Sequence, residues 1–96
     1  MLDARDTAIE YARNNQAGAL ETLKEIIRIP SVSTYSNNAQ EMRRAADWLV
    51  SALRQFGAKA EVYDTPGHPV VYGEIHAAQP HKPTVLVYGH YDVQPS

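Results

Sequence analysis

The stretch that decides the fold lies at the C-terminal end: Thr84-Val-Leu-Val-Tyr-Gly-His-Tyr-Asp-Val-Gln-Pro-Ser96. Residues 85–88 form a continuous apolar run of strand length, which is the pattern of a strand covered on both faces. His90 and Asp92 follow directly, and alternate residues of an extended strand point to the same side. A neutral imidazole is a good ligand for Zn²⁺, and a metal-bound histidine usually donates its other N–H to a carboxylate or carbonyl. The stretch therefore predicts a buried strand that leads into a candidate metal ligand, His90, with Asp92 beside it. Spacing alone does not distinguish this pair from an ordinary polar pair at a strand end.

A first helix is predicted over residues 3–29. Asp3 or Asp6 can accept hydrogen bonds from the unpaired backbone N–H groups at its start. Pro30 ends it, because the proline ring disfavours helical geometry at the preceding residue. Asn14 and Asn15 lie between two apolar stripes, so the helix can break or kink there.

A second helix is predicted from Asn38 to residue 56. Asn38 is a good N-cap, and Glu41 three residues later completes a capping-box pattern. Gly57 stands where a helix C-terminus favours a left-handed residue. One apolar stripe follows spacings of four and three residues and predicts the buried face of this helix: Met42, Ala46, Leu49, Leu53 and Phe56.

Three strands are predicted after the second helix, over residues 58–64, 70–76 and 85–88. The short turn at residues 65–69 favours an antiparallel hairpin between the first two strands. The order of elements is helix, helix, strand, strand, strand. It predicts an α/β fold in which two helices pack on a three-stranded mixed sheet.

Composition sets limits on the class of protein. The 96 residues allow one domain at most, and 44% hydrophobic with 21% charged residues is ordinary for a globular chain. A net charge of -2 gives no basic face for nucleic acid or for an anionic membrane. The chain has no cysteine, which excludes disulfides and thiolate metal sites. Residues 1–6 are charged and have no apolar run after them, so no secretory signal is expected. A cytoplasmic location is therefore predicted.

Five other polar residues are weighed and given ordinary roles. His68 is expected in a turn, and His76 and His81 are expected to be solvated. Ser31 and Ser33 near Pro30 are expected in a loop or cap, because no base is placed nearby to activate either hydroxyl as a nucleophile.

Longer motifs carry a resemblance to a known family. The string Val-Leu-Val-Tyr-Gly-His-Tyr-Asp-Val-Gln-Pro, residues 85–95, resembles the first metal-ligand motif of the cocatalytic zinc metallopeptidases. That family includes carnosinase-like dipeptidases, glutamate carboxypeptidases, aminoacylases and succinyl-diaminopimelate desuccinylase. Residues 23–33, Leu-Lys-Glu-Ile-Ile-Arg-Ile-Pro-Ser-Val-Ser, resemble its N-terminal signature. The matches cover essentially the whole chain in the right order, and the form of residues 89–95 is most similar to the dipeptidase branch.

The resemblance implies a fold and a site. It implies that residues 1–96 are the N-terminal fragment of a metallopeptidase catalytic domain, the opening part of an α/β sandwich. His90 matches the ligand of one metal, and Asp92 matches the catalytic-site carboxylate that orients that histidine. Such enzymes hold two divalent ions, zinc or manganese, and cleave small peptide substrates.

The family's remaining groups have no counterpart in residues 1–96. They are a bridging aspartate, a Glu-Glu pair, a further carboxylate and a final histidine. We therefore expect no catalysis by this chain alone, and at most weak binding of one metal ion through His90.

A second hypothesis is not enzymatic. The chain can be a catalytically incompetent fragment or a separate module that only associates. In this hypothesis the predicted strand 85–88 has an open edge, and a bare apolar edge invites pairing with another chain. Self-association is the expected consequence.

Overall fold

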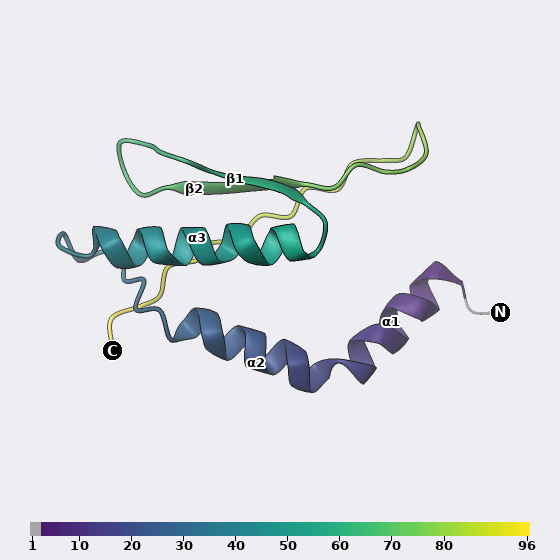
Figure 1. The fold of residues 1–96 in the computed structure, drawn as a ribbon, viewed down its shortest axis with the longest axis horizontal. Coiled ribbons are helices and arrows are strands. Elements are labelled where there is room, and N and C mark those ends of the chain that lie inside the picture. The colour runs from purple at the N-terminus through teal and green to yellow at the C-terminus, as the bar shows by residue number, and fades with distance from the viewer. Residues whose placement is uncertain (1–2) are drawn as a thin grey trace.

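The fold is a helix packed against a β-hairpin, with two further helices leading into it (Figure 1). The computed structural model describes residues 3–96; residues 1–2, part of the stretch expected to hold no secretory signal, lie outside it. None of the helices in residues 3–96 is long and apolar enough to cross a membrane. The elements, in chain order, are α1 (Ala4–Asn14), α2 (Gln16–Ile27), α3 (Ala39–Gln55), β1 (Lys59–Tyr63) and β2 (Val70–Glu74).

The first predicted helix is divided into α1 and α2. The Asp3 carboxylate accepts a hydrogen bond from the Asp6 backbone N–H at 2.8 Å, which confirms the predicted cap. Asn15 leaves helical geometry at φ −120° and ψ 19°, and its side-chain amide donates to the Tyr11 carbonyl at 2.8 Å. The break at Asn14–Asn15 is therefore confirmed, and the described residues form three helices where two were predicted. Neither α1 nor α2 has a buried residue.

Helix α3 carries the buried face of the core. Gly57, at φ 88°, takes the left-handed conformation predicted for the end of this helix. The buried apolar residues come from α3, from the loop before it and from the start of the hairpin: Ile29, Val32, Met42, Ala45, Ala46, Val50, Ala58 and Ala60. The core is thus small and centred on α3.

The predicted capping box at the start of α3 is wrong. Asn38 does occupy the N-cap position, but its side chain makes no capping hydrogen bond. Its amide group donates instead to the carbonyls of Pro30 at 2.8 Å and Val32 at 3.0 Å. Glu41 forms an ion pair with Arg44 at 3.2 Å. The reason is that the loop before α3 brings two carbonyls within reach of the Asn38 amide, which donates to them as a second partner beside their backbone hydrogen bonds and so does not face the start of the helix.

The predicted hairpin of the first two strands is confirmed, with shorter strands. β1 and β2 pair antiparallel in a register that places Ala60 opposite Gly73 and Val62 opposite Val71. A Cβ atom on Gly73 would lie 3.1 Å from Cδ1 of Leu53, so the absent side chain allows α3 to pack close to the sheet.

The third strand is not formed in the part of the chain that the structure describes. The sheet has two antiparallel strands, so the prediction of a three-stranded mixed sheet is wrong, while the α/β class holds. Residues 85–88 form no strand, and they are 81 to 89% exposed. An apolar run is buried only where two layers are available to cover it. Here α3 already packs on the hairpin, and no segment of residues 3–96 covers the run.

The small core predicts a large difference between two truncations to alanine. Met42 is 2% exposed, and Leu23 on α2 is 52% exposed. Met42→Ala should lower the free energy of unfolding by about 2–3 kcal/mol, because it leaves a cavity in the core. Leu23→Ala is the matched control and should change it by under about 0.5 kcal/mol. Urea unfolding monitored by circular dichroism measures both. Equal losses would show that Leu23 is covered in solution.

Candidate metal-binding site

The end of the chain is docked on the loop between α2 and α3. The Val93 backbone N–H donates to the Ser31 carbonyl at 2.9 Å. The Ser31 hydroxyl donates to the Tyr91 carbonyl at 3.0 Å, and Ser31 is fully buried. In Figure 1 the yellow end of the chain runs back past α3 and finishes beside this loop. Residues 91–93 are therefore held on residues 31–33 by hydrogen bonds from both backbone and side chain.

A second contact holds the same segment on the turn between β1 and β2. The Tyr91 hydroxyl donates to the Pro69 carbonyl at 2.6 Å. Burial, together with the nearby negative charge of Asp92, raises the pKa of the Tyr91 phenol, so the phenol keeps its proton for this bond. Tyr91 thus ties the segment to a second element.

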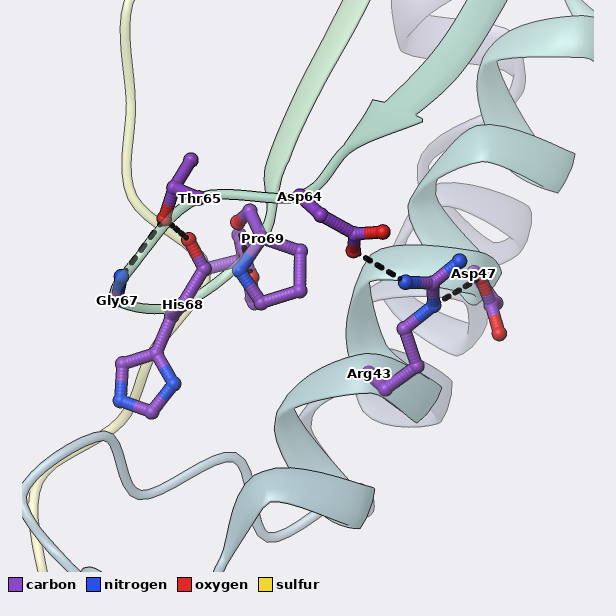
Figure 2. A network of polar contacts seen from close by, with 8 residues as sticks. Arg43, Asp47, Asp64, Thr65, Gly67, His68 and Pro69 are labelled. Carbon is purple, nitrogen blue, oxygen red and sulfur yellow. Dashed lines mark hydrogen bonds and ion pairs between the residues drawn. The ribbon is translucent and has the colours of Figure 1, made fainter.

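The turn that receives Tyr91 is itself closed by hydrogen bonds. The Thr65 hydroxyl accepts from the Gly67 backbone N–H at 3.0 Å and donates to the His68 carbonyl at 2.7 Å. Figure 2 shows the His68 ring pointing away from the turn toward the loop. Its Nε2 lies 2.8 Å from the Ser33 carbonyl. A carbonyl can only accept, so Nε2 of His68 carries the proton. The turn assignment predicted for His68 is confirmed, and this contact was not predicted.

An arginine of α3 fixes the other end of this turn. Nη1 of Arg43 lies 2.7 Å from Oδ1 of Asp64, and Nε of Arg43 lies 3.4 Å from Oδ1 of Asp47 (Figure 2). The pair is exposed and contributes little to global stability. It joins the turn directly to the helix that carries the core.

His90 and Asp92 meet, as the alternation of an extended chain predicts. Nδ1 of His90 lies 2.6 Å from Oδ1 of Asp92. A carboxylate only accepts, so Nδ1 is the donor, and the lone pair is left on Nε2. The His90 side chain is 80% exposed, and within residues 3–96 its Nε2 has no hydrogen-bond partner. The arrangement leaves Nε2 chemically able to bind a metal ion.

The second oxygen of Asp92 is also occupied. The Ser33 hydroxyl donates to Oδ2 of Asp92 at 2.5 Å. The hydrogen bond from Ser33, and then that from His90, holds the pKa of Asp92 below its usual value, so the carboxylate stays charged. Both oxygens accept one hydrogen bond each, which fixes the plane of the carboxylate.

Sequence reasoning missed Ser33. It was expected in a loop, and it is in one, but 59 residues separate it from the carboxylate it contacts. No spacing rule reveals such a pair, and the only signal was the motif of residues 23–33. The contact also argues against a nucleophilic serine. The Ser33 hydroxyl donates its hydrogen bond to Asp92 and not to a histidine, so the serine–histidine pair that activates a nucleophilic serine is not formed.

The residues present fit one corner of a metal site. In residues 3–96 no three His, Asp or Glu side chains gather in a way that could hold a metal ion. His76 lies apart, with Nε2 at 3.0 Å from Oε1 of Glu74, and His81 lies in a turn at φ 68°. His90 can give one ligand, while both Asp92 oxygens already accept hydrogen bonds.

The docking of the C-terminal segment should depend on pH through Asp92. Its folded-state pKa is lowered, so the carboxylate stabilises docking above the usual aspartate pKa of about 3.9. That contribution is lost as the pH falls through the lowered pKa. The chemical shift of the Val93 amide, followed by NMR between pH 7 and pH 2, should report this transition. Ser33→Ala should move its midpoint upward, and Asp92→Asn should abolish it. A midpoint unchanged by Ser33→Ala would contradict the assigned cause.

Comparisons with known proteins find similarity to three curated dipeptidases. No family model matches the chain, and no solved structure matches it. It is 36% identical over 84 residues to a Cys-Gly metallodipeptidase of Schizosaccharomyces pombe, covering 77% of this chain and 17% of the relative. A Cys-Gly metallodipeptidase of Candida albicans is 36% identical over 90 residues, covering 80% and 18%. A Beta-Ala-His dipeptidase of Rattus norvegicus is 31% identical over 100 residues, covering 91% and 20%. The chain is thus similar, over most of its own length, to about one fifth of these dipeptidases.

Proposed function

We propose that this chain is part of a dinuclear metal-dependent dipeptidase, to which it contributes the metal ligand His90 and its orienting carboxylate, Asp92. The observation that carries the proposal is the 2.6 Å contact between Nδ1 of His90 and Oδ1 of Asp92, which leaves an exposed Nε2 free to bind. The similarity to three dipeptidases supports it, and two of them are named as metallodipeptidases.

The chain's own residues prepare the ligand. Asp92 accepts a hydrogen bond from the Nδ1–H group of His90, and this bond fixes the tautomer. It also makes the lone pair on Nε2 more basic, so Nε2 becomes a stronger metal ligand. Two bound divalent ions, zinc or manganese, would polarise the scissile amide carbonyl and supply a water that is acidic enough to attack it. The general base and the remaining ligands have no counterpart in residues 3–96, so we assign this segment binding and orientation and no proton transfer to substrate.

The substrate class follows from the relatives. The fungal relatives are named for Cys-Gly and the rat relative for β-Ala-His, and both of these are dipeptides. We therefore propose a small peptide as substrate, cleaved at its amide bond.

The test uses the full-length protein that contains this segment. Bound zinc or manganese is counted by mass spectrometry, and hydrolysis of Cys-Gly and β-Ala-His is followed. His90→Ala should remove about one metal ion per chain and lower kcat/KM by about 100-fold or more, and Asp92→Asn should lower it by about 10–100-fold. His76→Ala, an exposed histidine paired with Glu74, is the matched control and should retain both. A wild-type protein without metal or without hydrolysis would refute the proposal.

Association through residues 85–88 is a second candidate function. It is favoured by one observation: four consecutive apolar side chains are 81 to 89% exposed. An extended apolar segment with free backbone groups can pair with a second chain.

Sedimentation of the 96-residue chain tests this candidate. A concentration-dependent dimer or larger species is expected, and Val87→Lys should restore the monomer, because a buried lysine in such an interface is costly. Tyr35→Lys, a change of another exposed apolar residue, is the control and should leave association unchanged. A chain that stays monomeric at high concentration would exclude this function.

A further inference from the structure

We infer that Ser33 is a positioning residue for His90, acting through Asp92. The inference rests on the proposed function for its purpose, and on the observed contacts for its geometry. The Ser33 hydroxyl donates to Oδ2 of Asp92 at 2.5 Å, and Nδ1 of His90 donates to Oδ1 of the same carboxylate at 2.6 Å. The three side chains form one chain of hydrogen bonds that ends at the free Nε2.

The serine is needed because a carboxylate held at one oxygen can still rotate. The hydrogen bond from Ser33 to Oδ2 stops the carboxylate from rotating, so the lone pairs of Oδ1 point in one direction. The Nδ1–H group of His90 has to point along that direction to donate to Oδ1. Without the hydroxyl, water competes for Oδ2 and the carboxylate samples other rotamers. The imidazole is then free to carry its proton on Nε2, where an N–H group repels a cation in place of a lone pair that would bind it.

The backbone of Ser33 is itself held by a hydrogen bond. His68 donates from Nε2 to the Ser33 carbonyl at 2.8 Å, which links the serine to the turn between β1 and β2. Two residues earlier, the carbonyl of buried Ser31 accepts from the Val93 N–H at 2.9 Å. Hydrogen bonds of the fold therefore hold both the loop that carries Ser33 and the segment that carries Asp92, and they set the distance between the two side chains. This fixed distance is what a positioning role requires.

The chain offers a matched control in Ser31. Its hydroxyl also bonds the C-terminal segment, at 3.0 Å, but to the Tyr91 carbonyl and not to the carboxylate. If serines of this loop only dock the segment, the two substitutions act alike. If Ser33 positions the imidazole, only its substitution changes the tautomer of His90.

The tautomers are measured by nitrogen-15 NMR of the histidine rings in the 96-residue chain, at a pH where free imidazole is neutral. In the wild type, His90 should carry its proton on Nδ1 and His68 on Nε2, as opposite tautomers in one spectrum. Ser33→Ala should shift His90 to a mainly Nε2–H form, Ser33→Thr should restore Nδ1–H, and Ser31→Ala should leave it unchanged. An unchanged His90 in Ser33→Ala, or an equal shift in Ser31→Ala, overturns the inference.

Loss of docking in Ser33→Ala is recognised from the Val93 amide, whose exchange protection reports the bond to Ser31. If that protection is lost, the tautomer of His90 is read in Ser33→Thr instead, because this variant keeps the hydroxyl. An Nδ1–H form of His90 in that variant supports the role, and an Nε2–H form overturns it.

Metal affinity gives the second readout, in the full-length protein with Zn²⁺ and a competing chelator. Ser33→Ala should weaken Zn²⁺ binding about 10-fold, which is the lower end of the effect of changing the direct partner of a ligand, and Ser33→Thr should recover most of it. A full-length wild type that binds no Zn²⁺ would refute the proposed function, while the tautomer measurement would still decide the role of Ser33. Wild-type affinity in Ser33→Ala would overturn that role.

Discussion

The docking of residues 91–93 on residues 31–33 is the constraint on which the candidate site depends. It orders a segment that forms no strand with the hairpin, and it does so through the Val93–Ser31 backbone bond, the buried Ser31 hydroxyl and the Ser33–Asp92 contact. His90 comes directly before this segment and has no packing of its own, since its side chain is 80% exposed. The position of its imidazole is therefore set by polar contacts two residues away and not by a core.

The turn between β1 and β2 also supports this docking, through contacts with both the loop and the C-terminal segment. It receives the Tyr91 hydroxyl, reaches the Ser33 carbonyl through His68 and is joined to α3 through Arg43 and Asp64. A loop, a turn and the end of the chain thus hold one another, and the core beneath them consists mainly of α3 and the hairpin. The core and the site also share the loop before α3, because Val32 is buried in the core between Ser31 and Ser33, which hold residues 91–93.

Local patterns predicted most of the elements, and long-range contacts explain where they failed. The Asp3 cap, the break at Asn15, the left-handed Gly57 and the hairpin all depend on neighbouring residues, so the sequence reveals them. The capping box failed because the Asn38 amide is used by the loop before α3. Residues 85–88 were predicted as a buried strand from their composition, but burial depends on what else is near in space. Ser33 was missed for the same reason.

The contact between Ser31 and Tyr91 joins residues 60 positions apart in the chain. Closing so long a loop lowers the conformational entropy of the chain before the stabilising hydrogen bonds can form. The residues that close it bury little apolar surface to offset this loss. We therefore expect the helix–hairpin core to form before the contacts that order His90. By the same reasoning, this closure opens more readily in native-state fluctuations than the helix–hairpin core does. We expect the free energy of local opening at residues 90–93 to be smaller than that of the core, so the imidazole can lose its fixed position while the helix and the hairpin stay folded.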